Sequence, residues 1–241
     1  MKKSLNLKTN KSDVFIIADV QNDFLPGGAL PIKESDQILP ILNEYIEIFK
    51  NSSSPIIAAR DWHPPNHVSF LAQGGLWPPH CIQDTDGAKF SPNLKLPESV
   101  TIVSKATNPE KEAYSIFDGT KLSEQLKSEG IVRIFIGGLA TDYCIVDSVL
   151  DARSAGFDVV VLADATYAIN LNPNDGDNAF EKMILSGASK QTLVDFPEPI
   201  LLPDPEDSIE TTTDKPLLSF DARKKARMRP KGSIKVRRER G

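Results

Sequence analysis

Four reactive side chains follow apolar stretches of this sequence. Asp19, Asp61 and Lys105 end three such stretches, and Cys144 comes a few residues after a fourth. A thiol at a helix N-terminus beside a lysine is expected to have a lowered pKa, which favours the nucleophilic thiolate. A carboxylate such as Asp19 can accept the thiol proton and return it to a leaving amine. These residue types therefore predict hydrolysis of an amide through Cys144.

Each of these residues also has an ordinary structural interpretation. An Asp after a strand often caps a turn, a Lys there is usually solvated, and a lone Cys is more often a small buried hydrophobic residue. Gly137 and Gly138, before the predicted helix of Cys144, favour either close packing or a turn whose N–H groups stabilise an oxyanion. Only the combination of thiol, base and cation favours catalysis.

The three histidines of the chain, His63, His67 and His80, fall in one irregular segment next to Asp61. Asp61 and His63 flank one residue of an extended stretch, so both side chains point to the same face and can chelate one ion, and His80 could complete the set. These donors suit one divalent ion, Zn, Mn or Fe, and do not by themselves select among them; Zn is the expected ion. His67 is a fourth ligand, a residue that supports a ligand, or a group that orients a bound water. The alternative is that the histidines only satisfy hydrogen bonds of the loop. Cys81 is expected to be buried and inert.

Alternating strands and helices are expected to position these side chains. The predicted strands, rich in β-branched residues, are 14–18, 55–59, 100–103, 132–136 and 159–162. The predicted helices, with apolar residues every three or four positions, are 37–49, 121–129, 142–155 and 178–185. This alternation predicts an α/β fold with three α/β/α layers, a mainly parallel sheet and ligands at the carboxyl ends of its strands. Residues 63–97, rich in Pro, Gly and Asn, are expected to form a long functional loop.

The length of 241 residues and a hydrophobic content of 40% predict one globular unit. We expect a short N-terminal extension over residues 1–12, a hydrolase domain over 13–200, and a Pro-rich acidic linker with a basic, disordered tail over 201–241. Two cysteines exclude a disulfide framework. The sequence has neither a long apolar run nor a signal peptide, which predicts a soluble cytoplasmic protein without a membrane partner.

The end of the chain is strongly basic. Residues 221–241 contain ten Lys or Arg against two acidic residues, whereas the whole chain has a net charge of −5. Such a tail is either simply solvated or serves to bind a polyanion such as nucleic acid or to target the protein.

Jointly, several stretches resemble the nicotinamidases within the isochorismatase-like cysteine hydrolases, over about residues 14–196. They are 19–24 (DVQNDF), 26–30 (PGGAL), 61–70 (DWHPPNHVSF), 77–81 (WPPHC), 113–117 (AYSIF) and 138–144 (GLATDYC), together with Lys105. Glu112 and Ala106 depart from the family's usual Asp and Gly, and the basic tail has no counterpart in the family pattern.

The resemblance implies hydrolysis of nicotinamide to nicotinate and ammonia, as in NAD salvage, with residue roles that follow the family. The implied catalytic triad is Asp19, Lys105 and Cys144, and the implied metal site is Asp61, His63 and His80. The N–H groups of Ala140 and Cys144 would form an oxyanion hole, with a cis peptide before Ala140. The implied substrate pocket consists of three aromatic residues and one amide that helps to place water, namely Phe24, Trp77, Tyr114 and Gln21.

Two other functions also agree with the sequence. One is another hydrolase of the same superfamily, acting on a vinyl ether or on a carbamoyl or ureido group, although such relatives generally lack the metal set. The other is a non-catalytic binding protein on the same fold, against which the intact triad argues. A homo-oligomer is also left open.

Overall fold

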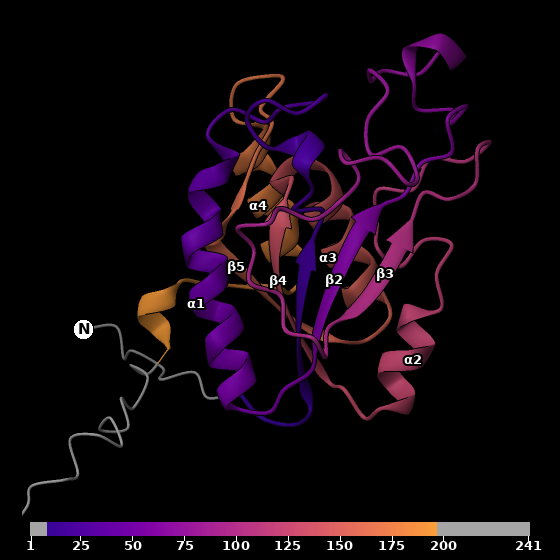
Figure 1. Ribbon diagram of the computed structural model, residues 1–241. Coiled ribbons are helices and arrows are strands. Elements are labelled where there is room, and N and C mark those ends of the chain that lie inside the picture. The colour runs from indigo at the N-terminus through magenta and orange to yellow at the C-terminus, as the bar shows by residue number, and fades with distance from the viewer. Residues whose placement is uncertain (1–8, 197–241) are drawn as a thin grey trace, which may run out of the picture. The chain divides into compact units, whose positions relative to one another are not determined.

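The computed structural model describes residues 9–196, which contain a six-stranded sheet (Figure 1). The strand order is β3-β2-β1-β4-β5-β6, and all neighbouring strands run parallel. The strands are β1 (Asp13–Ala18), β2 (Ile56–Asp61), β3 (Thr101–Lys105), β4 (Arg133–Leu139), β5 (Asp158–Tyr167) and β6 (Ser189–Gln191). The five predicted strands are confirmed. The short β6 was missed because its three polar residues carry no strand pattern.

Helices connect the strands and agree with the four predicted ones to within a few residues. They are α1 (Ile38–Asn51), α2 (Leu122–Ser128), α3 (Val146–Ser154) and α4 (Asp175–Leu185). The third predicted helix differs at its start, because Thr141–Ile145 forms a π-helical turn that leads directly into α3. Cys144 lies in this turn.

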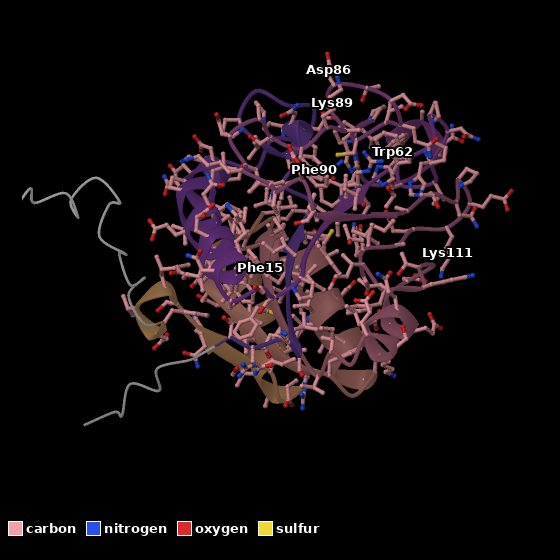
Figure 2. All side chains as sticks on the ribbon, turned by 60° about the horizontal axis from the view of Figure 1, so that its bottom comes forward. Phe15, Trp62, Asp86, Lys89, Phe90 and Lys111 are labelled. Atoms are coloured by element: carbon pink, nitrogen blue, oxygen red, sulfur yellow. The ribbon has the colours of Figure 1, made fainter. Side chains whose placement is uncertain are left out.

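Side chains of β1 alternate between two apolar layers. Phe15 and Ile17 pack in one cluster with residues of α1, whereas Val14 and Ile16 pack in another with residues of α2, α3 and α4. Helices therefore cover both faces of the sheet, which confirms the three-layer arrangement (Figure 1). Figure 2 shows Phe15 in the interior, while Asp86 and Lys89 of the long loop lie at the periphery. Burial on both faces accounts for strands that are apolar along nearly their whole length.

The strand order reverses at β1, since β2 and β3 lie on one side of it and β4 and β5 on the other. In open parallel sheets ligands bind at the carboxyl ends beside such a reversal. Gly138 of β4 lies opposite Ala18 of β1, has φ +118°, and leaves no room for a side chain against the Ala18 backbone. Gly138 therefore packs against the backbone of the neighbouring strand, and its lack of a side chain lets the ends of β1 and β4 approach each other.

Some predictions fall outside the described residues, namely those for the first eight residues, the acidic linker and the basic tail. The described residues all belong to one compact unit. Within residues 9–196, helices are all too short or too polar to cross a membrane. The long loop after β2 is irregular, as predicted, and over residues 63–97 it holds a single 3-10 turn, Leu71–Gln73.

Candidate active site

Lys105 is the centre of a buried polar cluster at the carboxyl ends of the strands. Its Nζ lies 3.1 Å from Asp19 Oδ2, 2.5 Å from Asp61 Oδ1 and 3.4 Å from Cys144 Sγ. Asp61 and Lys105 are partners in the parallel register of β2 and β3, which places their side chains side by side. The side chains predicted to meet from four separate strand ends are thus brought together.

Asp19 is buried, with 1% of its surface exposed. Its carboxylate oxygens contact the Lys105 ammonium and the Cys144 thiol, and they accept no backbone N–H within the described part of the chain. The interpretation of Asp19 as a turn cap is therefore wrong. Burial raises the pKa of Asp19 to about 7, although the charge of Lys105 acts to lower it. A carboxyl group with this pKa can accept and return a proton near neutral pH.

The expected lowering of the Cys144 pKa does not occur. Burial raises the pKa of this thiol well above its ordinary value, and the opposing effect of Lys105 is smaller. A thiolate held away from water loses more hydration than one nearby cation returns. Burial lowers the pKa of Lys105, but the charges of Asp19 and Asp61 together raise it by more, so the ammonium stays charged. The resting site holds a neutral thiol between a proton acceptor and a fixed cation.

Asp61, His63 and His80 form a second group beside this cluster. All three are buried, and one potential ligand atom from each lies within 4.8 Å of the other two. His63 Nδ1 lies 3.0 Å from the His80 carbonyl oxygen, and His80 Nδ1 lies 2.8 Å from that of Pro78. When each Nδ1–H donates to its carbonyl, the Nε2 atom of each ring keeps a free lone pair.

The protonation of this group suits a cation. Burial lowers the pKa of His63 to about 4, so its ring is neutral at pH 7. Burial raises the pKa of Asp61, but Lys105 and His63 lower it more, so the carboxyl is ionised. Two neutral imidazoles and one carboxylate are a usual donor set for a divalent metal ion. The residues present therefore fit the metal that the sequence predicts.

His67 lies against this group but its own ring nitrogens are already engaged. Its Nδ1 is 2.7 Å from Ser69 Oγ, its Nε2 is 3.1 Å from the Lys111 carbonyl oxygen, and its ring centroid is 4.4 Å from that of His63. His67 could also form a group with His63 and Glu112, which would compete for His63. Because both of its ring nitrogens are engaged, the geometry argues against direct ligation by His67, whose ring packs against that of His63.

A small cavity lies over Cys144. It encloses about 30 Å³, well below the roughly 300 to 1,000 Å³ of ordinary ligand sites. The residues that line it are Asp19, Phe24, Leu30, Ile32, Asp61, Trp77, His80, Tyr114, Leu139, Ala140, Tyr143, Cys144 and Ile169.

The aromatic wall agrees with the prediction in part. Phe24, Trp77 and Tyr114 line the cavity as expected, and Trp77 Nε1 donates to Tyr114 Oη over 3.0 Å. Tyr143 was not predicted, and its ring lies 5.3 Å from that of Trp77 and 5.4 Å from that of Tyr114. Its place directly before Cys144 was the available signal. Leu30, Ile32 and Ile169 lie in connecting segments, and no local sequence pattern predicts that their side chains reach the cavity.

Gln21 is not among the residues that line the cavity, which corrects its predicted place in the pocket. The fully buried amide is bound to the backbone of Asp61 and Ala88 instead. Ala140 and Cys144, the expected oxyanion hole, both line the cavity, and the peptide between Leu139 and Ala140 is cis as predicted. Cys81 is fully buried, and burial raises its pKa, in agreement with an inert thiol.

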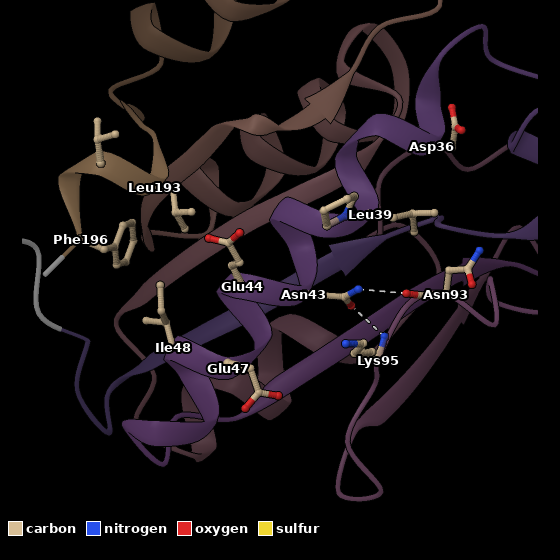
Figure 3. Close-up of a pocket in the computed structure, with 12 residues that line it drawn as sticks. Asp36, Leu39, Asn43, Glu44, Glu47, Ile48, Asn93, Lys95, Leu193 and Phe196 are labelled. Carbon is tan, nitrogen blue, oxygen red and sulfur yellow. Dashed lines mark hydrogen bonds between the residues drawn. The ribbon is translucent and has the colours of Figure 1, made fainter. Parts of the chain in front are cut away.

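A larger hollow of about 1050 Å³ lies along α1 (Figure 3). Its described lining includes Glu44, Glu47 and Lys95 beside apolar residues such as Leu39 and Phe196, but neither a thiol nor an imidazole. It therefore lacks the groups that the predicted chemistry needs, and the smaller cavity over Cys144 is the candidate active site despite its size.

Comparison with known proteins gives consistent matches. A family model described as the isochorismatase domain matches residues 13–193. Nicotinamidases of Escherichia coli and Acinetobacter baylyi are each 35% identical to the chain, over 76% and 77% of it and over 96% and 95% of their own lengths.

Solved structures are similar as well. The pyrazinamidase of Pyrococcus horikoshii, solved in complex with zinc, is 48% identical, with a TM-score of 0.72 and coverage of 75% of this chain and 99% of that one. A protein of L. infantum in complex with nicotinate is 32% identical, with a TM-score of 0.72 and coverage of 79% and 99%.

Proposed function

The chain belongs to the isochorismatase family, and from this premise and the site geometry we propose that it is a nicotinamidase, which hydrolyses nicotinamide to nicotinate and ammonia. One observation carries the proposal: Asp19 and Cys144, which both contact Lys105, line the same cavity as Asp61 and His80 of the candidate metal set. The nicotinamidases of E. coli and A. baylyi, similar over nearly their full lengths, support it.

Asp61, His63 and His80 would hold one divalent ion. The zinc in the P. horikoshii relative favours zinc as that ion. When bound, the ion would supply a positive charge that can bind the nitrogen of a pyridine ring. Asp61 and His80 also line the cavity over Cys144, so these residues would hold the ion beside the thiol. The rings of Phe24, Trp77 and Tyr114 offer aromatic contact to a flat substrate.

In the first half of the reaction, Asp19 accepts the proton of Cys144 as the sulfur attacks the carboxamide carbon. The charge of Lys105, 3.4 Å from Sγ, stabilises the developing thiolate. The carbonyl oxygen becomes an oxyanion, for which the N–H groups of Ala140 and Cys144 are the proposed donors. Asp19 then returns the proton to the nitrogen, the carbon–nitrogen bond breaks, and ammonia leaves a thioester on Cys144.

In the second half, Asp19 takes a proton from water, which attacks the thioester carbon. The same N–H groups of Ala140 and Cys144 would stabilise the second tetrahedral intermediate. Its collapse breaks the carbon–sulfur bond, the proton held by Asp19 returns to the sulfur, and the acid leaves and loses its own proton to solvent as nicotinate. One carboxyl group thus serves both steps, which requires a pKa close to the working pH; burial provides this for Asp19.

The proposal is tested by ammonia release from nicotinamide with the purified full-length chain. We expect turnover by the parent protein, with nicotinate as the second product, and background release by a Cys144→Ala variant. Equal release by both proteins would reject the nucleophile. If a carbamoyl or ureido compound is hydrolysed while nicotinamide is not, the alternative within the family is correct.

A further inference from the structure

The segment directly after β1 contacts both parts of the metal set. The side chain of Gln21 is fully buried and uses both ends of its amide on backbone. Its Nε2 donates to the carbonyl oxygens of Asp61, over 2.8 Å, and Ala88, over 2.9 Å, while its Oε1 accepts the Asp61 N–H over 2.8 Å. The backbone of Asp61 is thus held on both sides by one side chain.

Asp23, two residues further on, binds the backbone beside His80. Its Oδ2 accepts the N–H of Cys81 over 2.7 Å, and its Oδ1 accepts that of Ala29 over 3.1 Å. Cys81 directly follows His80 and has a positive φ of +46°, a conformation that needs support from its surroundings. The carboxylate of Asp23 therefore fixes the backbone at the point from which the His80 ring extends.

The three predicted ligands come from two chain segments, the end of β2 and the loop around residue 80. Direct contacts between these segments exist, since His63 N–H donates to the Cys81 carbonyl over 3.0 Å. The segment after β1 contacts both of them, because Gln21 binds the backbone at the end of β2 and Asp23 binds the backbone of the loop around residue 80. Neither side chain lines the cavity, so neither is placed to contact substrate.

We propose that Gln21 and Asp23 are positioning residues that set the distance between Asp61 and His80 and thereby the affinity of the site for its metal ion. This deepens the proposed function, because it concerns the metal site on which that function rests. Residues that fix metal ligands through hydrogen bonds typically change affinity by roughly 10- to 100-fold when they are replaced.

Two substitutions separate positioning from general stability. Gln21→Met keeps the length of the side chain and removes all three hydrogen bonds. Asp23→Asn keeps the shape but leaves one of the two N–H groups facing an amide donor instead of an oxygen. Asn43 provides the matched control: its amide also binds backbone in both directions, donating to Asn93 over 2.9 Å and accepting from Lys95 over 2.8 Å, away from the site (Figure 3).

The experiment measures the dissociation constant of Zn²⁺ for the metal-stripped full-length proteins, by competition with a chromophoric chelator, together with Tm. We expect binding to weaken about 10- to 100-fold in Gln21→Met and Asp23→Asn, and to stay unchanged in Asn43→Ala even where its Tm falls. Equal Zn²⁺ affinity in all folded variants and the parent would overturn the proposal.

Two further outcomes are informative. If Gln21→Met does not fold, the Zn²⁺ affinity of Asp23→Asn alone decides whether the proposal holds. A parent protein that binds no Zn²⁺ would overturn the metal site itself together with this proposal, whereas a parent that binds Zn²⁺ as tightly as its variants overturns only the positioning role. The readout does not depend on turnover, so an error in the assigned substrate does not affect it.

Discussion

Replacement of Asp19 by Asn should make the protein more stable and almost inactive at the same time. The carboxyl group is fully buried beside Lys105, and burial raises its pKa from 3.8 to about 7. Asn has the same shape, keeps an oxygen that can face the ammonium, and has no charge to desolvate. It cannot, however, accept the thiol proton of Cys144.

The stability effect follows from proton linkage. The folded state binds the Asp19 proton more tightly than the unfolded chain, so stability falls as pH rises from about 4 to about 7. One pKa unit corresponds to about 1.4 kcal/mol, which gives a loss of roughly 4 kcal/mol over this range. Asp19→Asn removes the loss, while Lys105 gives up one of two carboxylate partners. We therefore expect a net gain of about 2 to 4 kcal/mol above pH 7 and little change near pH 4.

The activity effect has the opposite sign. General base catalysis by a positioned side chain contributes about 100- to 10,000-fold to a rate, so ammonia release should fall by that factor. Urea unfolding at about pH 5 and pH 8 measures the stability, with the same divalent ion present throughout.

Asp13, at the other end of β1, is the matched control. It is fully buried too, but it is paired with Arg133 at 2.9 and 2.7 Å. Asp13→Asn should therefore lose roughly 1 to 3 kcal/mol and keep its activity. Two results would contradict this assignment of Asp19 as a proton acceptor whose charge is costly to bury. One is a loss of stability in Asp19→Asn like that in Asp13→Asn, and the other is a rate within tenfold of the parent.

Three further predictions concern the same site. Cys144→Ser should lose at least about 1,000-fold in rate with unchanged far-UV circular dichroism, since a serine hydroxyl is far harder to deprotonate than a thiol. Removal of divalent ions with a chelator should abolish ammonia release, and added Zn²⁺ should restore it; full activity after chelation would contradict the metal site. Tyr114→Phe removes the acceptor of the Trp77 indole N–H. It should raise KM about fivefold with a smaller change in kcat, which corresponds to the loss of one hydrogen bond of about 1 kcal/mol. An unchanged KM would show that this hydrogen bond does not contribute to substrate binding.

The convergence of the site was predictable because parallel strands share one carboxyl edge. Asp19, Lys105 and Cys144 were singled out by their positions at strand ends, and the arrangement of β1, β2, β3 and β4 brings them together. The metal set was predictable from the spacing of Asp61 and His63 in extended backbone, with His80 in the same loop. In these cases a local pattern determines where a side chain points.

Other properties depend on tertiary burial and could not be read from the chain. The pKa of Cys144 was expected to be low because of a helix N-terminus and Lys105, but the surrounding residues exclude water and raise it. Gln21 was assigned to the pocket, whereas its amide satisfies buried backbone groups that belong to Asp61 and Ala88. Leu30 and Ile169 reach the cavity from irregular segments, where neither period nor motif indicates direction.

The most direct test of the account is the location of the acyl group during turnover. The protein is mixed with nicotinamide, quenched with acid, digested and analysed by mass spectrometry. Because the chain contains only two cysteines, Cys81 serves as an internal control. A nicotinoyl group on the peptide that contains Cys144, and none on that of Cys81, is the predicted result. A label on Cys81, or steady turnover with the Cys144 peptide unmodified, would contradict the thioester mechanism.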